Sequence, residues 1–145
     1  MINEDFKEFI ELLNKNDVKY LVVGGYALAF HGHPRFTKDI DFWVWVNKKN
    51  AEKIMQTLQD FGFSSLDINE GDFLSPGYVV QLGQPPARID LLTSVTGLEF
   101  EECYTLRAHI DILGVKIDFI DLENFKKNKK AVGRHQDLAD LENLE

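Results

Sequence analysis

Apolar residues recur at helical spacing in the first segment of the chain. These residues are Phe6, Phe9, Ile10 and Leu13. They follow the i, i+3, i+4, i+7 rule of an amphipathic helix, and Asn3 stands where a capping residue belongs. The pattern therefore predicts a first helix that begins after Asn3. The apolar run 20–23 that follows predicts a short buried strand.

Two glycines, Gly24 and Gly25, interrupt this strand and predict a turn that leads directly into a second helix. This helix should cover residues 26–30. It should end near Gly32, because Pro34 disfavours helical backbone in the residue before it.

The rest of the chain alternates between strand and helix patterns. Residues 40–46 are apolar on both faces, which predicts a central strand that is covered on both sides. Helical spacing marks Ala51, Ile54, Met55, Leu58 and Phe61. The other expected elements are strands at 78–82 and 87–92, a strand pair within 106–120 that turns at Gly114, and helices at 122–132 and 136–144. We therefore expect one domain, residues 1–145, with a mixed α/β or α+β fold.

Composition narrows the class of protein. The 145 residues are 44% hydrophobic and include 11 phenylalanines, which is enough to bury one core. A formal net charge of −8 argues against a surface that binds polyanions broadly, so any nucleic-acid contact should be local. The single cysteine, Cys103, cannot form an internal disulfide, and the acidic N-terminus lacks the layout of a secretion signal. We expect a cytoplasmic protein that does not enter a membrane.

Two like charges open the strand predicted at 40–46. Asp39 and Asp41 are two residues apart, so on a strand their side chains share a face, with Cα atoms roughly 6.5 to 7 Å apart. Carboxylates held this close repel each other unless a proton or a divalent cation intervenes. Oxygen ligands suit Mg²⁺, which binds carboxylates together with substrate phosphates. The motif points to phosphoryl or nucleotidyl transfer, whereas an isolated pair of this kind is more often a solvated strand end.

Two further features support a nucleotide site. The turn at Gly24 and Gly25 joins a strand to a helix, and free N–H groups at the start of a helix attract phosphate. Asp90 lies between two apolar residues of the strand predicted at 87–92, where an unpaired buried carboxylate would be costly. Coordination of a metal shared with the first two carboxylates would remove this cost.

Other polar residues offer alternatives. Asp111 and Asp118 also lie in alternating strands and are rivals for the position of the third carboxylate. Because they flank the turn at Gly114, we expect them instead to face each other as surface charges. His31 and His33 form an H-x-H pattern, but a zinc site would need two more ligands. We expect His31 to form a hydrogen bond near the cleft.

Together these residues resemble the DNA polymerase beta-like nucleotidyltransferase superfamily. Its pattern is a glycine pair, a short helix, a D-x-D motif and a third aspartate on a later strand. More narrowly, 24-GGYALAFHGHPRFTKDIDF-42 and 124-NFKKNKKAVGRHQDLADLENL-144 look like small bacterial nucleotidyltransferases related to abortive-infection (AbiEii-like) toxins. The resemblance implies a nucleotidyltransferase fold, in which a mixed β-sheet is flanked by helices.

The resemblance also implies an activity and roles for individual residues. Gly24 and Gly25 would hold a nucleoside triphosphate such as ATP. The catalytic and metal-binding carboxylates would be Asp39, Asp41 and Asp90, with Mg²⁺ or Mn²⁺ as the metal. An acceptor hydroxyl on RNA such as tRNA, on a protein or on a small molecule would attack the α-phosphate. Many members carry Gly-Ser where this chain has Gly25 and then Tyr26, so an inactive nucleotide-binding or antitoxin-like module is the alternative.

Positive partners for a triphosphate lie in two places. Arg35 and Lys38 precede the D-x-D motif and can reach the same cleft. The only basic cluster of the sequence is Lys126, Lys127, Lys129, Lys130 and Arg134. The family-like stretch contains this cluster, so we expect Lys130 and Arg134 to contact nucleotide or an RNA-like acceptor. Asp137 should pair with Arg134 or cap the last helix.

The acceptor and the biological role stay open. Larger relatives add a helical domain that holds the acceptor, so a small acceptor, a partner protein or a homodimer should complete the surface here. A toxin–antitoxin or abortive-infection role follows from the resemblance alone. A third reading is an interaction domain whose acidic residues are only surface charges.

Overall fold

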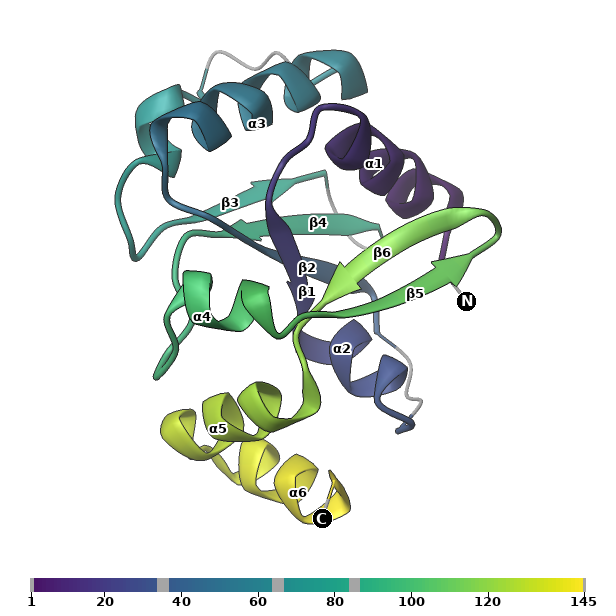
Figure 1. Ribbon diagram of the computed structural model, residues 1–145, viewed down its shortest axis with the longest axis vertical. Coiled ribbons are helices and arrows are strands. Elements are labelled where there is room, and N and C mark those ends of the chain that lie inside the picture. The colour runs from purple at the N-terminus through teal and green to yellow at the C-terminus, as the bar shows by residue number, and fades with distance from the viewer. Residues whose placement is uncertain (1, 34–36, 64–66, 84–86, 145) are drawn as a thin grey trace.

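The fold is a mixed sheet with helices on both faces (Figure 1). The computed structural model describes residues 2–33, 37–63, 67–83 and 87–144. Its strands are β1 (Tyr20–Val23), β2 (Asp39–Val44), β3 (Val79–Leu82), β4 (Arg88–Leu92), β5 (Ala108–Ile112) and β6 (Val115–Phe119). They lie in the order β3-β4-β2-β1-β6-β5. The predicted mixed sheet flanked by helices is therefore confirmed.

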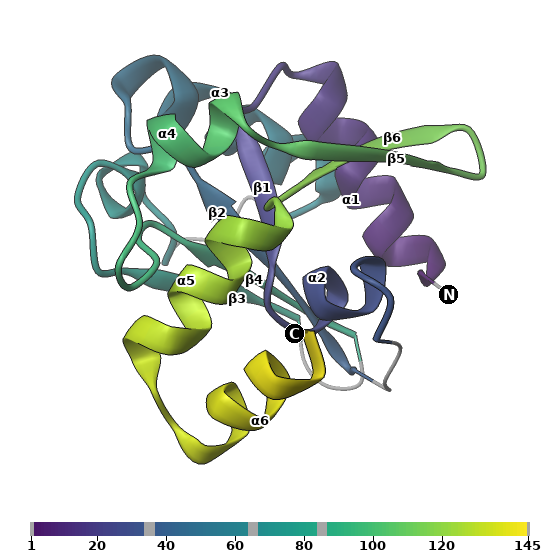
Figure 2. The ribbon, with the colours of Figure 1, turned by 60° about the horizontal axis from the view of Figure 1, so that its bottom comes forward.

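Helices pack against both sides of this sheet (Figures 1 and 2). The helices of the described part of the chain are α1 (Glu4–Lys15), α2 (Gly24–Phe30), α3 (Lys48–Phe61), α4 (Phe100–Thr105), α5 (Leu122–Val132) and α6 (His135–Leu144), together with the 3₁₀ helix η1 (Glu70–Phe73). Among the described residues, no helix is long and apolar enough to cross a membrane.

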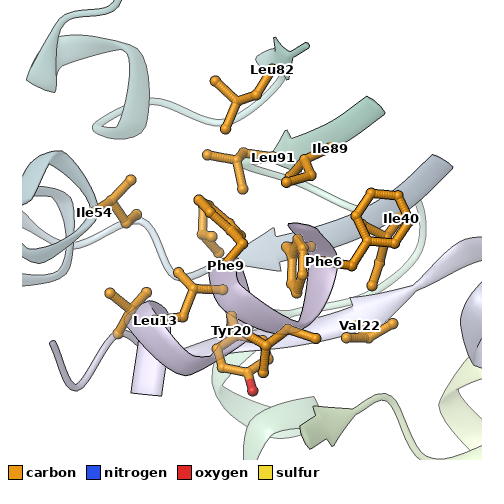
Figure 3. Packing of buried hydrophobic residues seen from close by; sticks show 14 of the residues in the cluster. Phe6, Phe9, Leu13, Tyr20, Val22, Ile40, Ile54, Leu82, Ile89 and Leu91 are labelled. Carbon is orange, nitrogen blue, oxygen red and sulfur yellow. The ribbon is translucent and has the colours of Figure 1, made fainter. Parts of the chain in front are cut away.

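The larger apolar cluster lies between the sheet and the pair α1 and α3. Figure 3 shows labelled side chains of both helices directed at those of β1, β2, β3 and β4. Phe9 on α1 packs its ring 5.5 Å from that of Phe42 on β2, and both rings are fully buried. On the opposite face, Trp43 of β2 packs edge-on against Phe100 of α4 at 5.2 Å. Since adjacent residues of β2 enter two different cores, this strand is covered on both sides, as its sequence predicts.

Local sequence signals set most of the element ends. The side chain of Asn3 accepts a hydrogen bond of 2.8 Å from the backbone N–H of Phe6 and caps α1. Gly62 ends α3 in the left-handed conformation, with φ of 95°. The strand predicted at 40–46 ends earlier, at Val44. The carbonyl of Trp45 accepts a hydrogen bond from the side chain of Asn50 at 2.9 Å, so the chain is already turning into α3.

Two short elements are not among the predicted helices and strands. Helix α4 has six residues and no side-chain cap, so it offers too few turns for a helical period to show. The 3₁₀ helix η1 has four residues, and its only buried side chain is Phe73. A local contact also holds η1, because the side chain of Asp72 accepts a hydrogen bond of 3.0 Å from the backbone N–H of Asn69.

The expected pairing of Asp111 with Asp118 is wrong. The turn between β5 and β6 holds two residues, so Asp111 lies opposite Lys116 and Asp118 lies opposite His109. Asp118 is buried, and its Oδ1 lies 2.9 Å from Nδ1 of His109. Only Asp111 is the surface charge that the sequence suggests.

The last two helices are joined by a buried charge cluster. Nζ of Lys129 on α5 lies 3.3 Å from Oδ1 of Asp137 and 3.0 Å from Oδ2 of Asp140 on α6. Arg134 donates a hydrogen bond of 2.6 Å from Nε to Asp137, so the predicted pairing of these two residues is confirmed. Hydrogen bonding from Arg134 lowers the pKa of Asp137. Lys129 is therefore an internal counter-ion rather than part of a solvated basic face.

Asp137→Asn tests this cluster. A carboxyl whose folded pKa lies below its unfolded value of about 3.9 stabilises the fold above that value and loses this effect as pH falls through the folded pKa. We expect the variant to lose about 2–3 kcal/mol of unfolding free energy at pH 7. Urea unfolding at several pH values should show this difference shrinking below about pH 4. Asp111→Asn, which changes an exposed carboxylate, is the control, and an equal loss in both variants would contradict the assignment.

Candidate functional site

Strand pairing gathers the three predicted carboxylates. Strand β2 runs parallel to β4, with Asp41 opposite Asp90 and Asp39 opposite Arg88. Neighbouring strands lie about 4.8 Å apart and paired residues share a face, so all four side chains occupy one patch. Strand β1 runs antiparallel to β2 and places Val23 opposite Asp41. The patch therefore lies beside the turn in which β1 passes into α2.

An arginine that the sequence analysis did not single out lies among these carboxylates. Arg88 donates from Nε to Oδ1 of Asp90 at 2.9 Å and from Nη2 to Oδ2 of the same residue at 3.1 Å. The same Nη2 also donates to Oδ2 of Asp39 at 2.8 Å. The spacing R-x-D on a strand puts Arg88 and Asp90 on one face, and this signal could have identified the pair from sequence.

Among the described residues, no cationic side chain forms an ion pair with Asp41, whereas Arg88 pairs with Asp39 and Asp90. Burial and the nearby charge of Asp90 raise the pKa of Asp41 to about 7, and Asp39 adds a smaller effect in the same direction. Arg88 lowers this pKa only in part. Near neutral pH the patch therefore carries more negative charge than its one guanidinium balances.

The glycine turn lies directly against this carboxylate. Gly24 has φ of 70°, and a Cβ built there would collide with Oδ2 of Asp41. A Cβ at Gly25 would lie 2.9 Å from Oγ1 of Thr37, so the hydroxyl of Thr37 covers the second glycine. Among the described residues, no side chain caps the start of α2. Its first backbone N–H groups, which a helix leaves without intrahelical partners, therefore have no side-chain acceptor in that part of the chain.

Four lysines and arginines are predicted to contact nucleotide, and the structure describes three of them. Lys38 is exposed one residue before the patch, and Arg35 lies outside the described residues. Lys130 is exposed near the end of α5, and Arg134 is held by Asp137. No recorded contact in the described part of the chain joins either of the last two to the carboxylates. Nε2 of His31 lies 2.8 Å from the carbonyl oxygen of Ile120, a backbone contact at the end of β6.

The donors fit a hard divalent cation in kind but not in arrangement. Three carboxylates with surplus negative charge are the ligands that Mg²⁺ prefers. Within the described ranges, however, no group of three or more acidic, histidine or cysteine side chains is placed to hold a metal ion. Two of the three carboxylates are bonded to Arg88 instead.

A cavity of about 370 Å³ opens at the other end of β2 and β4. Its walls include Trp43, Trp45, Thr93, Ser94, Glu99, Phe100 and Glu101. Trp43 lies two residues after Asp41 and therefore on the same face of the sheet. Aromatic walls with hydroxyl and carboxylate groups suit an organic molecule that carries polar groups.

A comparison with models of protein families finds one family that matches the chain. A family model described as a nucleotidyl transferase of unknown function (DUF2204) matches residues 2–145. A search of curated proteins finds no match.

Solved structures agree in fold. A proposed nucleotidyltransferase from Thermotoga maritima is 16% identical, with a TM-score of 0.66 over 99% of this chain and 94% of its own. The lincosamide antibiotic adenylyltransferase LnuA, bound to lincomycin, is 17% identical, with a TM-score of 0.59 over 99% of this chain and 96% of its own. An antigenic nucleotidyltransferase-like protein from Paracoccidioides brasiliensis is 15% identical, with a TM-score of 0.58 over 95% of this chain and 72% of its own.

Gly24→Ala tests the contact between the turn and Asp41. Gly32→Ala is a matched control, because Gly32 also has positive φ, and no atom of the described residues lies within 4 Å of an added Cβ there. Both variants lose stability because alanine disfavours a left-handed backbone, but only Gly24→Ala must also displace the carboxylate of Asp41. We expect Gly24→Ala to be the less stable by a further 1–3 kcal/mol or so in urea unfolding. Equal losses would show that Asp41 moves aside freely.

Asp41→Asn should stabilise the metal-free protein at alkaline pH. An acid whose folded pKa is raised loses stability as pH rises from its unfolded value of 3.8 through about 7. The asparagine side chain does not ionise, so it does not lose stability in this way. We therefore expect Asp41→Asn to gain about 1–2 kcal/mol of unfolding free energy at pH 8 and less at pH 5. Asp39→Asn should give no gain, since Arg88 pairs with that carboxylate. Chemical unfolding in chelator measures both, and identical behaviour would refute the assignment.

Proposed function

The chain belongs to the family of nucleotidyl transferases whose model it matches, and from this membership we propose a metal-dependent transfer of a nucleoside monophosphate from a triphosphate to an acceptor hydroxyl. The observation that carries the proposal is the register of β2 with β4. It places Asp39, Asp41 and Asp90 on one patch beside the glycine turn at Gly24.

The reaction needs little covalent chemistry from the protein. The acceptor oxygen bonds to the α-phosphorus, the bond to pyrophosphate breaks, and the hydroxyl proton passes to Asp90. Asp39 and Asp41 would hold Mg²⁺ or Mn²⁺ with Asp90, and the metal would offset the charge that develops on the phosphate oxygens. The surplus negative charge of the patch supports this assignment, because only added positive charge lets three carboxylates face a triphosphate.

The triphosphate would be held at the start of α2. Gly24 and Gly25 leave backbone N–H groups open there, and Lys38 adds a nearby cation, with Arg35 proposed from sequence alone. This chain lacks the serine of Gly-Ser relatives. The hydroxyl of Thr37 lies where a side chain on residue 25 would extend, so we propose that it supplies the missing hydroxyl contact.

The acceptor is a small molecule, a protein hydroxyl or the end of an RNA such as tRNA. The cavity beside Trp43 supports a small molecule, because it has the size and the mixed lining of an organic ligand site. Lys130 and Arg134 would contact nucleotide or RNA, and the net charge of −8 confines any RNA contact to such a local patch. A partner protein or a second copy of the chain would extend this surface. A role in a toxin–antitoxin or abortive-infection system is proposed from the likeness of residues 24–42 and 124–144 alone.

A second candidate is a module that binds nucleotide without turnover. Two observations favour it: residue 25 is glycine rather than serine, and Arg88 engages two of the three carboxylates. Such a module would bind a triphosphate with or without the charge of Asp90. The two functions therefore differ in what Asp90→Asn does to product formation and to nucleotide affinity.

Transfer of label tests the leading function. We expect Mg²⁺ or Mn²⁺, one of four α-³²P nucleoside triphosphates and an extract fractionated into RNA, protein and small molecules to yield a labelled acceptor. Asp90→Asn should lower this yield by at least a hundredfold, with nucleotide affinity changed less, because it removes the proposed proton acceptor. Asp111→Asn, a surface carboxylate, should match the wild type.

Nucleotide binding measured on the same proteins separates the outcomes. Triphosphate binding that is equal in wild type and Asp90→Asn, without labelled product from any fraction, would favour the binding module. Neither binding nor transfer would contradict both functions.

A further inference from the structure

Arg88 bridges two carboxylates of the patch. Its guanidinium makes three hydrogen bonds of 2.8 to 3.1 Å, two to Asp90 and one to Asp39. Nη2 takes part in bonds to both residues, so the cation links β4 to β2 between these carboxylates. Charge-assisted bonds of this kind are among the strongest that side chains form.

The neighbouring charges make this arrangement specific. Asp39, Asp41 and Asp90 bring three negative charges at full ionisation, and Arg88 is the one cation that contacts them among the described residues. Removal of the guanidinium without a replacement would leave all three facing one another. The guanidinium therefore offsets part of the repulsion among these carboxylates before any substrate binds.

The same contacts prevent a closed metal site. A carboxylate oxygen that accepts a hydrogen bond from Arg88 has a lone pair that is no longer directed at a metal, and the positive guanidinium repels an ion nearby. This accounts for the lack of a metal-binding group in the described part of the chain, although the ligand types are suitable.

Burial indicates which contact can be released. The side chain of Asp90 is 9% exposed, whereas those of Arg88 and Asp39 are 27% and 31% exposed. The single bond to Asp39 is therefore open to solvent, and the paired bonds to Asp90 are more protected. An arginine on a flexible stem can leave Asp39 for water without disturbing the sheet.

We propose that Arg88 is a built-in counter-ion that competes with the divalent metal, so that metal binding requires its guanidinium to release Asp39. The inference rests on the proposed function, because it takes the metal from that reaction. It assigns Arg88 a positioning role: the arginine holds the carboxylates in register without metal and yields the site when metal arrives.

Metal binding without nucleotide tests the inference. Free Mn²⁺ is followed by electron paramagnetic resonance in titrations of wild type, Arg88→Met and Lys49→Met. Arg88→Met keeps an unbranched apolar stem like that of arginine and removes the guanidinium and its charge. Lys49 is an exposed cation on α3, so its variant controls for the change in net charge.

We expect Arg88→Met to bind Mn²⁺ roughly 10- to 100-fold more tightly than wild type, because one competing charge-assisted contact is lost. Lys49→Met should stay within about twofold of wild type, since exposed charges far from the site are screened. Unchanged or weaker binding by Arg88→Met would overturn the inference and leave the proposed metal-dependent function intact. Binding by neither protein would overturn both.

A second measurement on the wild type covers the case in which Arg88→Met does not fold. The chain has four arginines, Arg35, Arg88, Arg107 and Arg134. Their guanidinium Nη and Nε signals can be assigned in ¹⁵N spectra and followed as Mg²⁺ is added. We expect the Nη2 signal of Arg88, which reports the bond to Asp39, to shift and to exchange faster with water, while its Nε signal and the signals of Arg107 and Arg134 change less. A static Arg88 signal at metal saturation would overturn the inference.

Discussion

The parallel pairing of β2 with β4 is the constraint on which the rest of the site depends. Both strands are apolar on the face toward α1 and α3, where Ile40, Phe42, Ile89 and Leu91 are buried. A slip of one residue would turn these side chains away from that core and would bring charged ones into it. The hydrophobic core therefore fixes the register, and the register sets Asp41 opposite Asp90. Burial of apolar side chains on the opposite face of the sheet offsets the electrostatic repulsion between Asp41 and Asp90.

Charge is distributed very differently in two parts of this acidic protein. Between α5 and α6, Lys129 and Arg134 meet Asp137 and Asp140, and the cluster serves to hold two helices together. On the sheet, three carboxylates meet one guanidinium, and burial together with the nearby charge of Asp90 raises the pKa of Asp41. Balanced charges suit a structural contact. Carboxylates whose surplus negative charge the fold retains despite their repulsion are typical of a site where a bound ligand neutralises that charge.

Much of the fold and part of the site could be predicted from sequence, because both rest on short-range periodicity. The helical spacing of α1 and α3 and the turn at Gly114 are local signals, and each corresponds to an observed element. The rule that alternate strand residues share a face also groups Asp39 with Asp41. The position of Arg88 against Asp39 follows from pairing between strands that are 49 residues apart in sequence, and no local pattern contains it.

The errors have the same origin. Asp118 looks like Asp111 in sequence, and only the two-residue turn decides that it is buried beside His109. Lys129 belongs to a basic run, yet the packing of α6 makes it an internal charge. Helix α4 is too short for periodicity to show.

Both tryptophans of the chain, Trp43 and Trp45, border the same cavity, four residues or fewer beyond Asp41. Indole emission responds to the polarity of its surroundings, and no other residue of this protein emits in the same range. The unlabelled protein therefore has an intrinsic fluorophore in the wall of the cavity where a small molecule would bind. Spectra of the native chain can be used to screen compound collections before any acceptor is known.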